Sequence, residues 1–519
     1  MEETLHTVDY IIVLVALIFF VLFGLSFSWK QKSTGHFFTA SGTIPSWAVG
    51  LSILATLISS ITFLAYPGAG FSSNWILLVQ GLMVPVVLIF MLNFIVPFYR
   101  KVIGVSTYEY FEKRFGYIAR LYTSLAFSMA HFSKMGTVFF LLALALSSMM
   151  GVDIYTVILV LGVVVIFYTM IGGIEAVIWL DVIQGIMLLA GGILCLGVMF
   201  AVAPPIEMIE FAWKNDKIGF GPYDWDFTRL TFFVIALNGI FYAIQKYGTD
   251  QTIVQRYLTA KSHKEAVKAA FIGVLFCVPI WMLFMFVGSM LFSFYNVTDF
   301  ALPEAIRADS VFPFFITTQL PIGVTGLILA GLVAAALSSL DSDLNSLSAV
   351  GVEDYYKRLF PNKSDGHYLI VGRSIVVLCG IGALGIAAMY VEAEGETVLG
   401  IVFALYAIFS GGIAGLFLLG IFSKRANKQG LYIGIIVTVL FTAWAMLTSQ
   451  PVGATEEPLL NLGSYNFTHH SYMLGVYTHF IIIGVGYAAS FLFPAYQADD
   501  SLTIYGYWKA KKVSRQLKK

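Results

Sequence analysis

The stretch GLVAAALSSLDSDLNSLSAV, from Gly331 to Val350, is apolar enough for a membrane helix, yet it carries several hydroxyl and carboxylate side chains. Helical spacing places four of them on one face, at i, i+3, i+4 and i+7: Ser338, Asp341, Ser342 and Asn345. Oxygen ligands along one face of an intramembrane helix suit a small alkali cation. The same pattern also fits a polar interface between helices. The two aspartates favour the cation, because a carboxylate at membrane depth is costly unless it is paired or bound to an ion.

The composition of the chain is typical of a membrane protein. Of its 519 residues, 59% are hydrophobic and only 12% are charged, whereas soluble domains are usually about 25% charged. The formal net charge is +0, so the charge balance gives no reason to expect nucleic acid as a partner. The three cysteines lie inside apolar runs and are expected to be core residues. The first apolar run starts at Tyr10 with no cleavage site before it, which predicts a retained helix and not a signal peptide.

The apolar runs predict an all-α polytopic membrane protein. A helix needs about 20 apolar residues to cross a bilayer, and about thirteen segments of this chain qualify. They lie near residues 10–28, 46–70, 75–98, 121–149, 154–171, 177–202, 231–250, 267–294, 321–350, 368–390, 397–420, 430–448 and 473–494.

Basic residues are concentrated in alternate loops, which predicts the orientation of the chain. One set of loops contains Lys30, Lys32, Arg100, Lys101, Lys113, Arg114, Lys261, Lys264, Lys357, Arg358, Lys424, Arg425 and Lys428. The other set contains only Lys214, Lys217, Arg229 and Arg307. The first set is therefore expected in the cytoplasm, with the N-terminus outside and the basic C-terminal tail inside. We expect a multi-pass protein of the plasma (cell inner) membrane.

Two of the apolar segments are interrupted by polar and small residues. The segment SWAVGLSILATLISSITFLAYPGAGF begins at Ser46, and ALNGIFYAIQKYGTDQTIVQRYLTAKS begins at Ala236. Interrupted helices at corresponding positions of two halves are typical of transporters, where half-helix ends and freed carbonyls bind ions and substrate. Counting five spans from each predicts an inverted repeat. The predicted parts are 1–45, an extra N-terminal transmembrane helix with a cytoplasmic loop; 46–202, the first repeat; 203–229, an outside loop; 230–420, the second repeat; 421–495, two additional transmembrane helices; and 496–519, a basic cytoplasmic tail.

Several stretches, taken in order, resemble the sodium:solute symporter family. They are LATLISSITF in the first interrupted segment, YTMIGGIEAVIWLDVIQG at 168–185, DQTIVQRYLTAKS at 250–262, AALSSLDSDLNS at 335–346 and FLLGIFSKRANKQG at 417–430. Within the family the pattern is most similar to the bacterial sialic acid transporters. The resemblance implies a leucine-transporter fold, a five-plus-five inverted repeat that works by alternating access, with one helix before the core and two after it.

The resemblance also implies sodium sites. The family's general site falls on Ala55, Ile58, Ala335, Ser338 and Ser339. A possible second sodium site falls on Asp181, Asp341 and Ser342. Here Asp341 replaces a serine of the pattern, so an additional carboxylate either strengthens cation binding or carries a proton. The alternative for Asp181 is a residue at a helix end near the cytoplasmic surface.

The solute site implied by the resemblance is altered in its chemistry. The candidate solute contacts are Ser59, Ser60, Thr62, Gln80, Lys134 and Gln245. Lys134 stands where the sialic acid transporters have a carboxylate-binding arginine, and an ammonium cannot reproduce a bidentate guanidinium. Its alternative role is an internal pair with Asp341 or Asp343. Gln245 could instead fill the bundle. Lys246 is expected to pair with Asp250, one turn on. His131 is expected to pack, with a proton relay as its alternative role.

These patterns predict a secondary active transporter and not an enzyme. The expected activity is sodium-coupled import of a small polar organic solute, an anion such as sialic acid or another carboxylate. A neutral sugar or polyol is the alternative solute, and a transporter-like sensor or channel is a remote alternative function. The expected partners are the solute, co-transported sodium and the lipid bilayer, without nucleic acid, and a monomer is expected to suffice for transport.

Overall fold

The computed structural model describes residues 5–58, 60–304, 306–392, 411–449, 458–494 and 499–509, apart from the side chains of Ser60, Ile61 and Phe90. These residues are mostly helical, as the sequence predicts. The α-helices are α1 (Thr7–Leu25), α2 (Thr34–Thr39), α3 (Ser46–Leu57), α4 (Ser60–Ser72), α5 (Leu78–Val102), α6 (Glu109–Phe115), α7 (Tyr117–Met150), α8 (Ile154–Val202), α9 (Pro205–Lys214), α10 (Phe232–Gly248), α11 (Gln251–Thr259), α12 (His263–Val297), α13 (Ala308–Gln319), α14 (Val324–Val350), α15 (Lys357–Leu359), α16 (Asp365–Glu392), α18 (Ile413–Phe422), α19 (Lys428–Ser449) and α20 (Ser471–Ala489). A π-helical turn, η4 (Gly351–Tyr356), continues α14, and short 3₁₀ turns lie at Ser28–Lys30, Ala40–Gly42, Trp75–Leu77, Gly463–Tyr465, Ser490–Leu492 and Asp500–Leu502.

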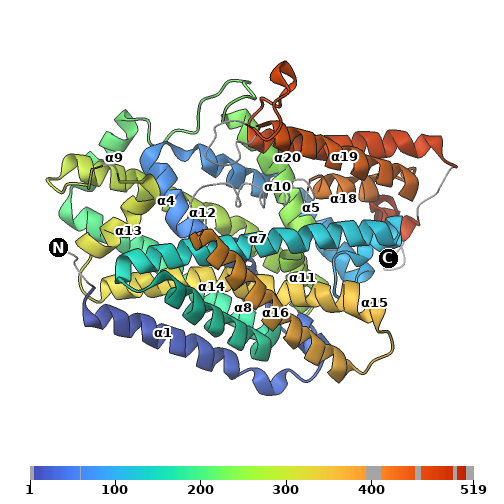
Figure 1. The fold of residues 1–519 in the computed structure, drawn as a ribbon, viewed down its shortest axis with the longest axis horizontal. Helices are drawn as coiled ribbons and strands as arrows, with labels where there is room; N and C mark the ends of the chain where they lie inside the picture. Colours follow the sequence, from blue (N-terminus) through green and yellow to red (C-terminus); the bar gives the residue numbers. More distant parts are fainter. Residues whose placement is uncertain are drawn as a thin grey trace, which may run out of the picture.

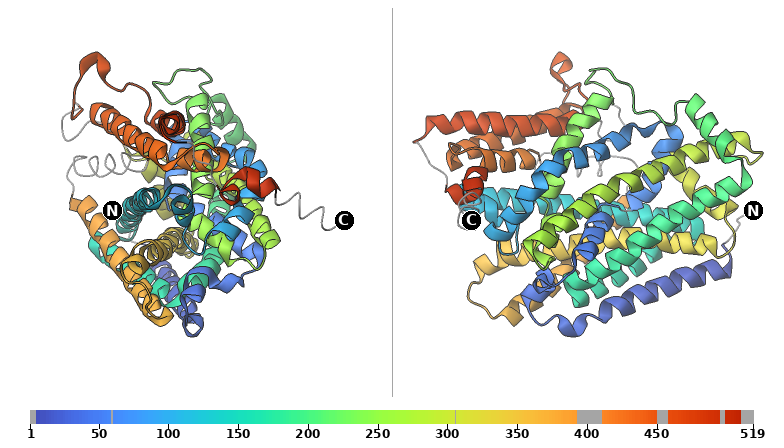
Figure 2. Two further views of the ribbon diagram at one scale, coloured as in Figure 1. Left: turned by 90° about the vertical axis from the view of Figure 1, so that its right-hand side faces the viewer. Right: turned by 180° about the vertical axis from the view of Figure 1, so that it is seen from behind.

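Most of the long helices run lengthwise through the molecule, and the start of α1 and the last described residues lie at opposite ends of it (Figures 1 and 2). Among the described residues, eight helices are long and apolar enough to cross a membrane, or up to ten if two bent pairs are each one span. The predicted all-α membrane class is confirmed, but the predicted number of about 13 spans is not. One predicted span, 397–420, lies partly outside the described residues, and α10 has only 17 residues.

The predicted spans 154–171 and 177–202 both fall within α8, where two helices meet at Gly173. Gly173 has a φ of 59°, a conformation that only glycine adopts without cost. A Cβ at this position would also lie 2.8 Å from the Phe37 ring. The glycine pair of the IGGIEA motif therefore permits the chain to turn between two apolar helices.

Both interrupted segments are broken helices in the structure. Helices α3 and α4 meet at an angle of 55°, and Ile58, at the break, has an extended conformation with φ −104° and ψ 106°. Helix α10 ends at Gly248, and α11 starts three residues later with Asp250 as its N-cap. The Asp250 carboxylate accepts the Thr252 amide at 2.8 Å. Breaks of this kind leave backbone groups free to bind ions and solute.

The polar helix α14 lies in the interior of the bundle, in contact with α1, α7, α8 and α16. Almost all of its residues are buried, so its hydroxyls and carboxylates contact other helices and not lipid. Asp9 of α1 holds its N-terminus in place, because the Asp9 carboxylate accepts the Gly323 and Gly326 amides at 2.8 Å each. These amides have no partner within the helix, so the carboxylate satisfies them and interacts favourably with the helix dipole.

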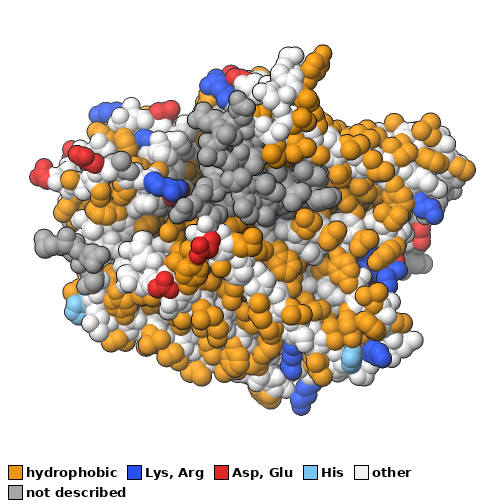
Figure 3. Space-filling model, in the orientation of Figure 1, with side chains coloured by type: hydrophobic (Ala, Val, Ile, Leu, Met, Phe, Trp, Pro, Cys, Tyr) orange, Lys and Arg blue, Asp and Glu red, His pale blue; other side chains and the backbone are white. Residues whose placement is uncertain are grey.

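Hydrophobic side chains cover much of the described surface over α1, α8 and α16 (Figure 3). Exposed apolar residues on these helices include Ile11, Leu22, Val163, Leu378 and Ile381. Exposed apolar surface of this extent suits contact with the hydrocarbon of a bilayer.

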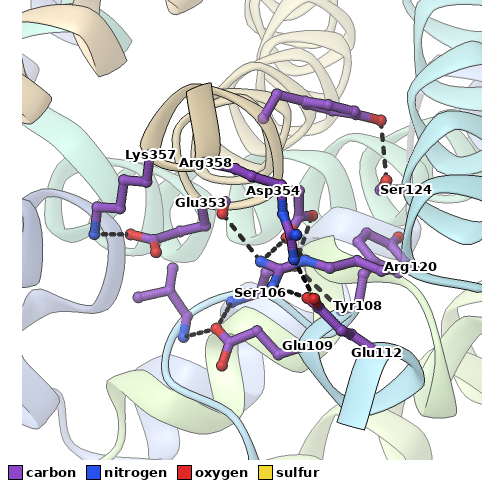
Figure 4. Close-up of polar contacts among 12 residues, drawn as sticks. Ser106, Tyr108, Glu109, Glu112, Arg120, Ser124, Glu353, Asp354, Lys357 and Arg358 are labelled. Carbon is purple, nitrogen blue, oxygen red and sulfur yellow. Dashed lines mark hydrogen bonds and ion pairs between the residues drawn. The ribbon is translucent and has the colours of Figure 1, made fainter. Parts of the chain in front are cut away.

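Ion pairs join α6, α7 and η4 at the end of the molecule where α15 lies (Figures 1 and 4). We call Glu112, Arg120, Asp354 and Arg358 the η4 cluster. Nε of Arg120 donates to Asp354 at 2.7 Å and its Nη1 to Glu112 at 2.7 Å, and Arg358 also contacts Glu112. Ser106 donates to the second oxygen of Asp354 at 2.8 Å. The cluster thus connects the loop after α5 to the end of α14.

Candidate functional site

The residues expected to form the general sodium site lie where α14 passes the break between α3 and α4. The Ser338 hydroxyl lies 3.4 Å from the Ala55 carbonyl oxygen and 3.0 Å from that of Ala335. The Ser339 hydroxyl is buried without a hydrogen-bond partner among the described residues. Ile58 is buried and has left the helical conformation. Carbonyl and hydroxyl oxygens without a full charge are ligands that a monovalent cation accepts.

Asp181 is fully buried on α8, so the alternative of a helix-end residue near the surface is not supported. One of its oxygens accepts from Arg256 of α11 at 2.8 Å and from Ser52 at 2.5 Å. The guanidinium is itself fully buried and also donates to Ser342 at 2.6 Å and to the Thr252 carbonyl at 2.6 Å. A tethered cation therefore lies within the predicted second sodium site. The other Asp181 oxygen has no hydrogen-bond partner among the described residues.

Asp341 is fully buried and is held by hydroxyl groups. Tyr168 donates to it at 2.8 Å and Ser342 at 3.3 Å. Asp341 and Asp181 lie close enough to interact electrostatically. Arg256 balances one of these two carboxylates, so one negative charge remains for a cation or a proton. The replacement of a serine by Asp341 in the sequence leads us to expect such an additional negative charge.

Lys134 forms an ion pair with Asp343 of α14 at 3.0 Å, and 26% of its side chain is exposed. This is the internal pair that the sequence offers as the alternative to solute binding. His131 lies one turn before Lys134, with Nδ1 at 2.7 Å from Asp343 and Nε2 at 3.2 Å from Asp250. The expectation that His131 only packs is wrong. The predicted pair of Lys246 and Asp250 is confirmed at 2.5 Å.

The remaining expected solute contacts are Ser59, Ser60, Thr62, Gln80 and Gln245. Ser59 and the side chain of Ser60 lie outside the described residues. Thr62 is buried on α4. Gln80 of α5 donates to Asn238 of α10 at 2.8 Å, so its amide is already engaged in a contact between helices. Gln245, on α10, is partly exposed.

Reasoning from the sequence alone missed the roles of Arg256, His131 and Tyr168, and it left open whether Asp341 or Asp343 pairs with Lys134. The signal for Arg256 is present, because it lies in the quoted VQRY motif and a buried Asp181 requires a cationic partner. Asp343 is the second intramembrane carboxylate of α14. Lys134 lies within an apolar run, where its positive charge requires an acid as a partner. Which of the available acids contacts which base depends on how α7, α11 and α14 pack, and helical spacing does not determine this.

Comparisons with known proteins agree with this architecture. The family model described as the sodium:solute symporter family matches residues 37–438. The chain is 35% identical to the sodium/sialic acid symporter NanT of Aliivibrio fischeri, over 85% of this chain and 88% of that protein. It is 34% identical to the sodium/sialic acid symporter SiaT of Proteus mirabilis, over 83% and 88%. A solved structure of a Na⁺-coupled sialic acid symporter in a substrate-bound outward-open state superposes with a TM-score of 0.85 at 30% identity, covering 95% of this chain and 99% of that chain. The fold is that of the leucine transporter, with five-plus-five core helices, and this chain belongs to the sodium:solute symporter family.

Proposed function

We propose that this sodium-coupled symporter imports a sialic acid, or a closely related sugar carboxylate, by alternating access. The observation that carries the proposal is Lys134, a partly exposed ammonium in the interior of the bundle. Intramembrane lysines of this kind mark substrate or ion sites. The sialic acid transport of relatives that are more than a third identical supports the same solute class.

Sodium is proposed to bind in two places. The first is formed by the carbonyls of Ala55, Ile58 and Ala335 with the hydroxyls of Ser338 and Ser339, and the unpartnered Ser339 hydroxyl supports it. The second lies between Asp181, Asp341 and Ser342, beside the Arg256 guanidinium. Its support is the one carboxylate charge that Arg256 leaves unbalanced.

A neutral sugar or polyol is the second candidate solute. The observation that favours it is the ion pair of Lys134 with Asp343. In this pair the ammonium is already neutralised, so it does not require an anionic solute. Lys134 would then be part of the scaffold.

The two candidates are separated by thermal unfolding of the purified protein with N-acetylneuraminate or its methyl ester, each in sodium chloride and in potassium chloride. A ligand that binds the folded state raises its stability, and the proposal expects the acid to stabilise more than the ester, in sodium. Lys134→Gln should weaken binding of the acid by about 2–5 kcal/mol and leave the ester unaffected, whereas Lys134→Arg should retain part of the preference. Equal losses for acid and ester would favour the neutral solute.

We further propose that the protein lies in the plasma membrane with its N-terminus outside and its C-terminus in the cytoplasm, with inverted repeats at 46–202 and 230–420 and a monomer sufficient for transport. The first and last described parts of the chain lie at opposite ends of the molecule, which supports placing them on opposite sides of the membrane (Figure 1). The concentration of basic residues in one set of loops supports the direction. Its test is labelling of intact cells with a membrane-impermeant maleimide, since all three native cysteines are buried. Asn215→Cys should react and Lys363→Cys should not; both positions are exposed. Reaction of Lys363→Cys and not of Asn215→Cys would show that the protein has the opposite orientation.

A further inference from the structure

His131 lies between two carboxylates in the interior of the bundle. It is 4% exposed, with Nδ1 at 2.7 Å from Asp343 of α14 and Nε2 at 3.2 Å from Asp250 at the start of α11. The other charged groups around it are Lys134 on its own helix, which contacts Asp343, and Lys246 of α10, which contacts Asp250. From α6, the ring of the N-cap Tyr108 packs at a tilt of 47° against Phe127, and Phe127 in turn contacts the imidazole with ring centroids 4.1 Å apart.

This geometry requires an additional proton. A neutral imidazole donates from one nitrogen and accepts at the other. Its unprotonated nitrogen would therefore face a carboxylate oxygen with no proton between them, which is repulsive. Asp250 also accepts from Lys246, from the Thr252 amide and from the Thr252 hydroxyl. Asp343 also accepts from Lys134. Both acids therefore accept from an ammonium group, which favours their ionised form, and the proton belongs on the imidazole.

The proton changes the charge that Lys134 presents to the solute. Lys134 and Lys246 balance Asp343 and Asp250, so an imidazolium at His131 leaves one positive charge in excess. Of these five side chains, Lys134 is the most exposed. When His131 is protonated it neutralises Asp343, and the Lys134 ammonium becomes available to an anion. When His131 is neutral, Lys134 is the remaining cation beside Asp343, so the ammonium stays paired with this carboxylate and is less available to an anion.

We propose that protonation of His131 controls the affinity of this transporter for an anionic solute, because His131 and Lys134 share Asp343. The inference rests on the proposed function, in which Lys134 binds the solute carboxylate. Binding of the anion should therefore take up a proton. Affinity should rise as the pH falls through the titration of His131, by up to about tenfold per pH unit.

The test is calorimetric titration of the protein with N-acetylneuraminate between pH 5.5 and 8.5, in buffers of different ionisation enthalpy. A solute carboxylate of ordinary acidity stays ionised throughout this range, so it contributes no protons. Wild type should take up protons and bind more tightly at low pH. His131→Gln should bind with a flat pH profile and without proton uptake. His479→Gln is the matched control, since His479 is also buried but packs on Phe241, and no hydrogen bond or ion pair joins its side chain to a described acid.

Wild-type binding that is independent of pH, with no proton uptake, would overturn the inference even if His131→Gln fails to fold. An unchanged pH profile in a folded His131→Gln would also overturn it. Failure of the proposed function has a different signature, because the methyl ester would then bind as well as the acid at every pH. If the protein binds the acid more tightly than the ester but takes up no proton, the proposed function stands and only the role of His131 is rejected.

Discussion

The buried pair of Arg256 and Asp181 allows a quantitative test of the second sodium site. Arg256→Met removes the guanidinium and retains an unbranched, apolar side chain. Both partners are 0% exposed, so the change leaves a buried carboxylate without its cation. Breaking such a pair usually costs about 3–5 kcal/mol. The double variant Arg256→Met/Asp181→Asn removes both charges and should recover most of this loss.

Sodium makes the prediction specific to the site. If Asp181 belongs to a cation site, sodium should replace part of the missing guanidinium charge in Arg256→Met. A bound ion stabilises by about 2.7 kcal/mol at about 100 times its Kd, so the single variant should gain more from sodium chloride than wild type does. Potassium chloride is the control for ionic strength.

Thermal unfolding of wild type, the two single variants and the double variant in both salts measures these effects. Additive losses in the double variant would show that the two charges are not coupled. An equal gain from sodium and potassium in Arg256→Met would refute the assignment of Asp181 to a sodium site, and Asp181 would be a structural partner of Arg256.

Three further predictions concern other positions. Ser339→Ala should weaken the sodium dependence of uptake into proteoliposomes while the protein still inserts, and unchanged uptake in sodium-free medium would contradict the general site. Asp341→Asn should lower the number of sodium ions moved per solute, measured as the ratio of ²²Na⁺ flux to solute flux, and a wild-type ratio would leave Asp341 structural. Burial raises the pKa of Glu112, but hydrogen bonds from Arg120 and Arg358 lower it overall, so the ionised Glu112 carboxylate should contribute stability at neutral pH that is lost only as the pH falls through this low pKa. Glu112→Gln should therefore destabilise the protein at pH 7, by about 1 kcal/mol or less because water reaches the pair, and should have no effect in acid; an equal loss at both pH values in thermal unfolding would contradict this.

The sequence was sufficient to predict the fold class and where the polar helix lies along the chain. Apolar runs, the positions of the two interrupted helices and the order of the motifs all depend on local sequence. The Ser338 contact with the Ala55 carbonyl follows from the motifs as well, because the break at Ile58 and the serines of α14 are both visible in the sequence. The number of spans was predicted less well. Helix α10 is shorter than a full span, and two predicted spans fall within α8, where the chain turns at Gly173.

The polar contacts between helices were harder to predict. His131, Lys134 and Asp343 each carry a visible signal, but their arrangement depends on the rotation of α7 against α14. Arg256 illustrates the same difficulty, because an amphipathic nine-residue helix gives no indication that its arginine faces α8. A pairing rule would have improved the prediction: every buried charge in an apolar chain needs a partner, and the few available acids and bases restrict the choice.

If the proposed sodium and solute sites are correct, the two aspartates on α14 provide a route by which they are coupled. Residues 341 and 343 are two apart, so they differ by about 3 Å along the helix axis and by about 200° around it. Asp341 accordingly faces Tyr168 on α8, toward the proposed second sodium site, whereas Asp343 faces His131 and Lys134 on α7. A cation bound beside Asp341 reduces the negative potential along α14 and so weakens the attraction between Asp343 and Lys134. The Lys134 ammonium then interacts more strongly with an anionic solute, and by linkage the solute raises the affinity for sodium by the same factor. With both proposed sites in place, one buried helix with carboxylates on opposite faces would suffice to couple the two ligands, without direct contact between them.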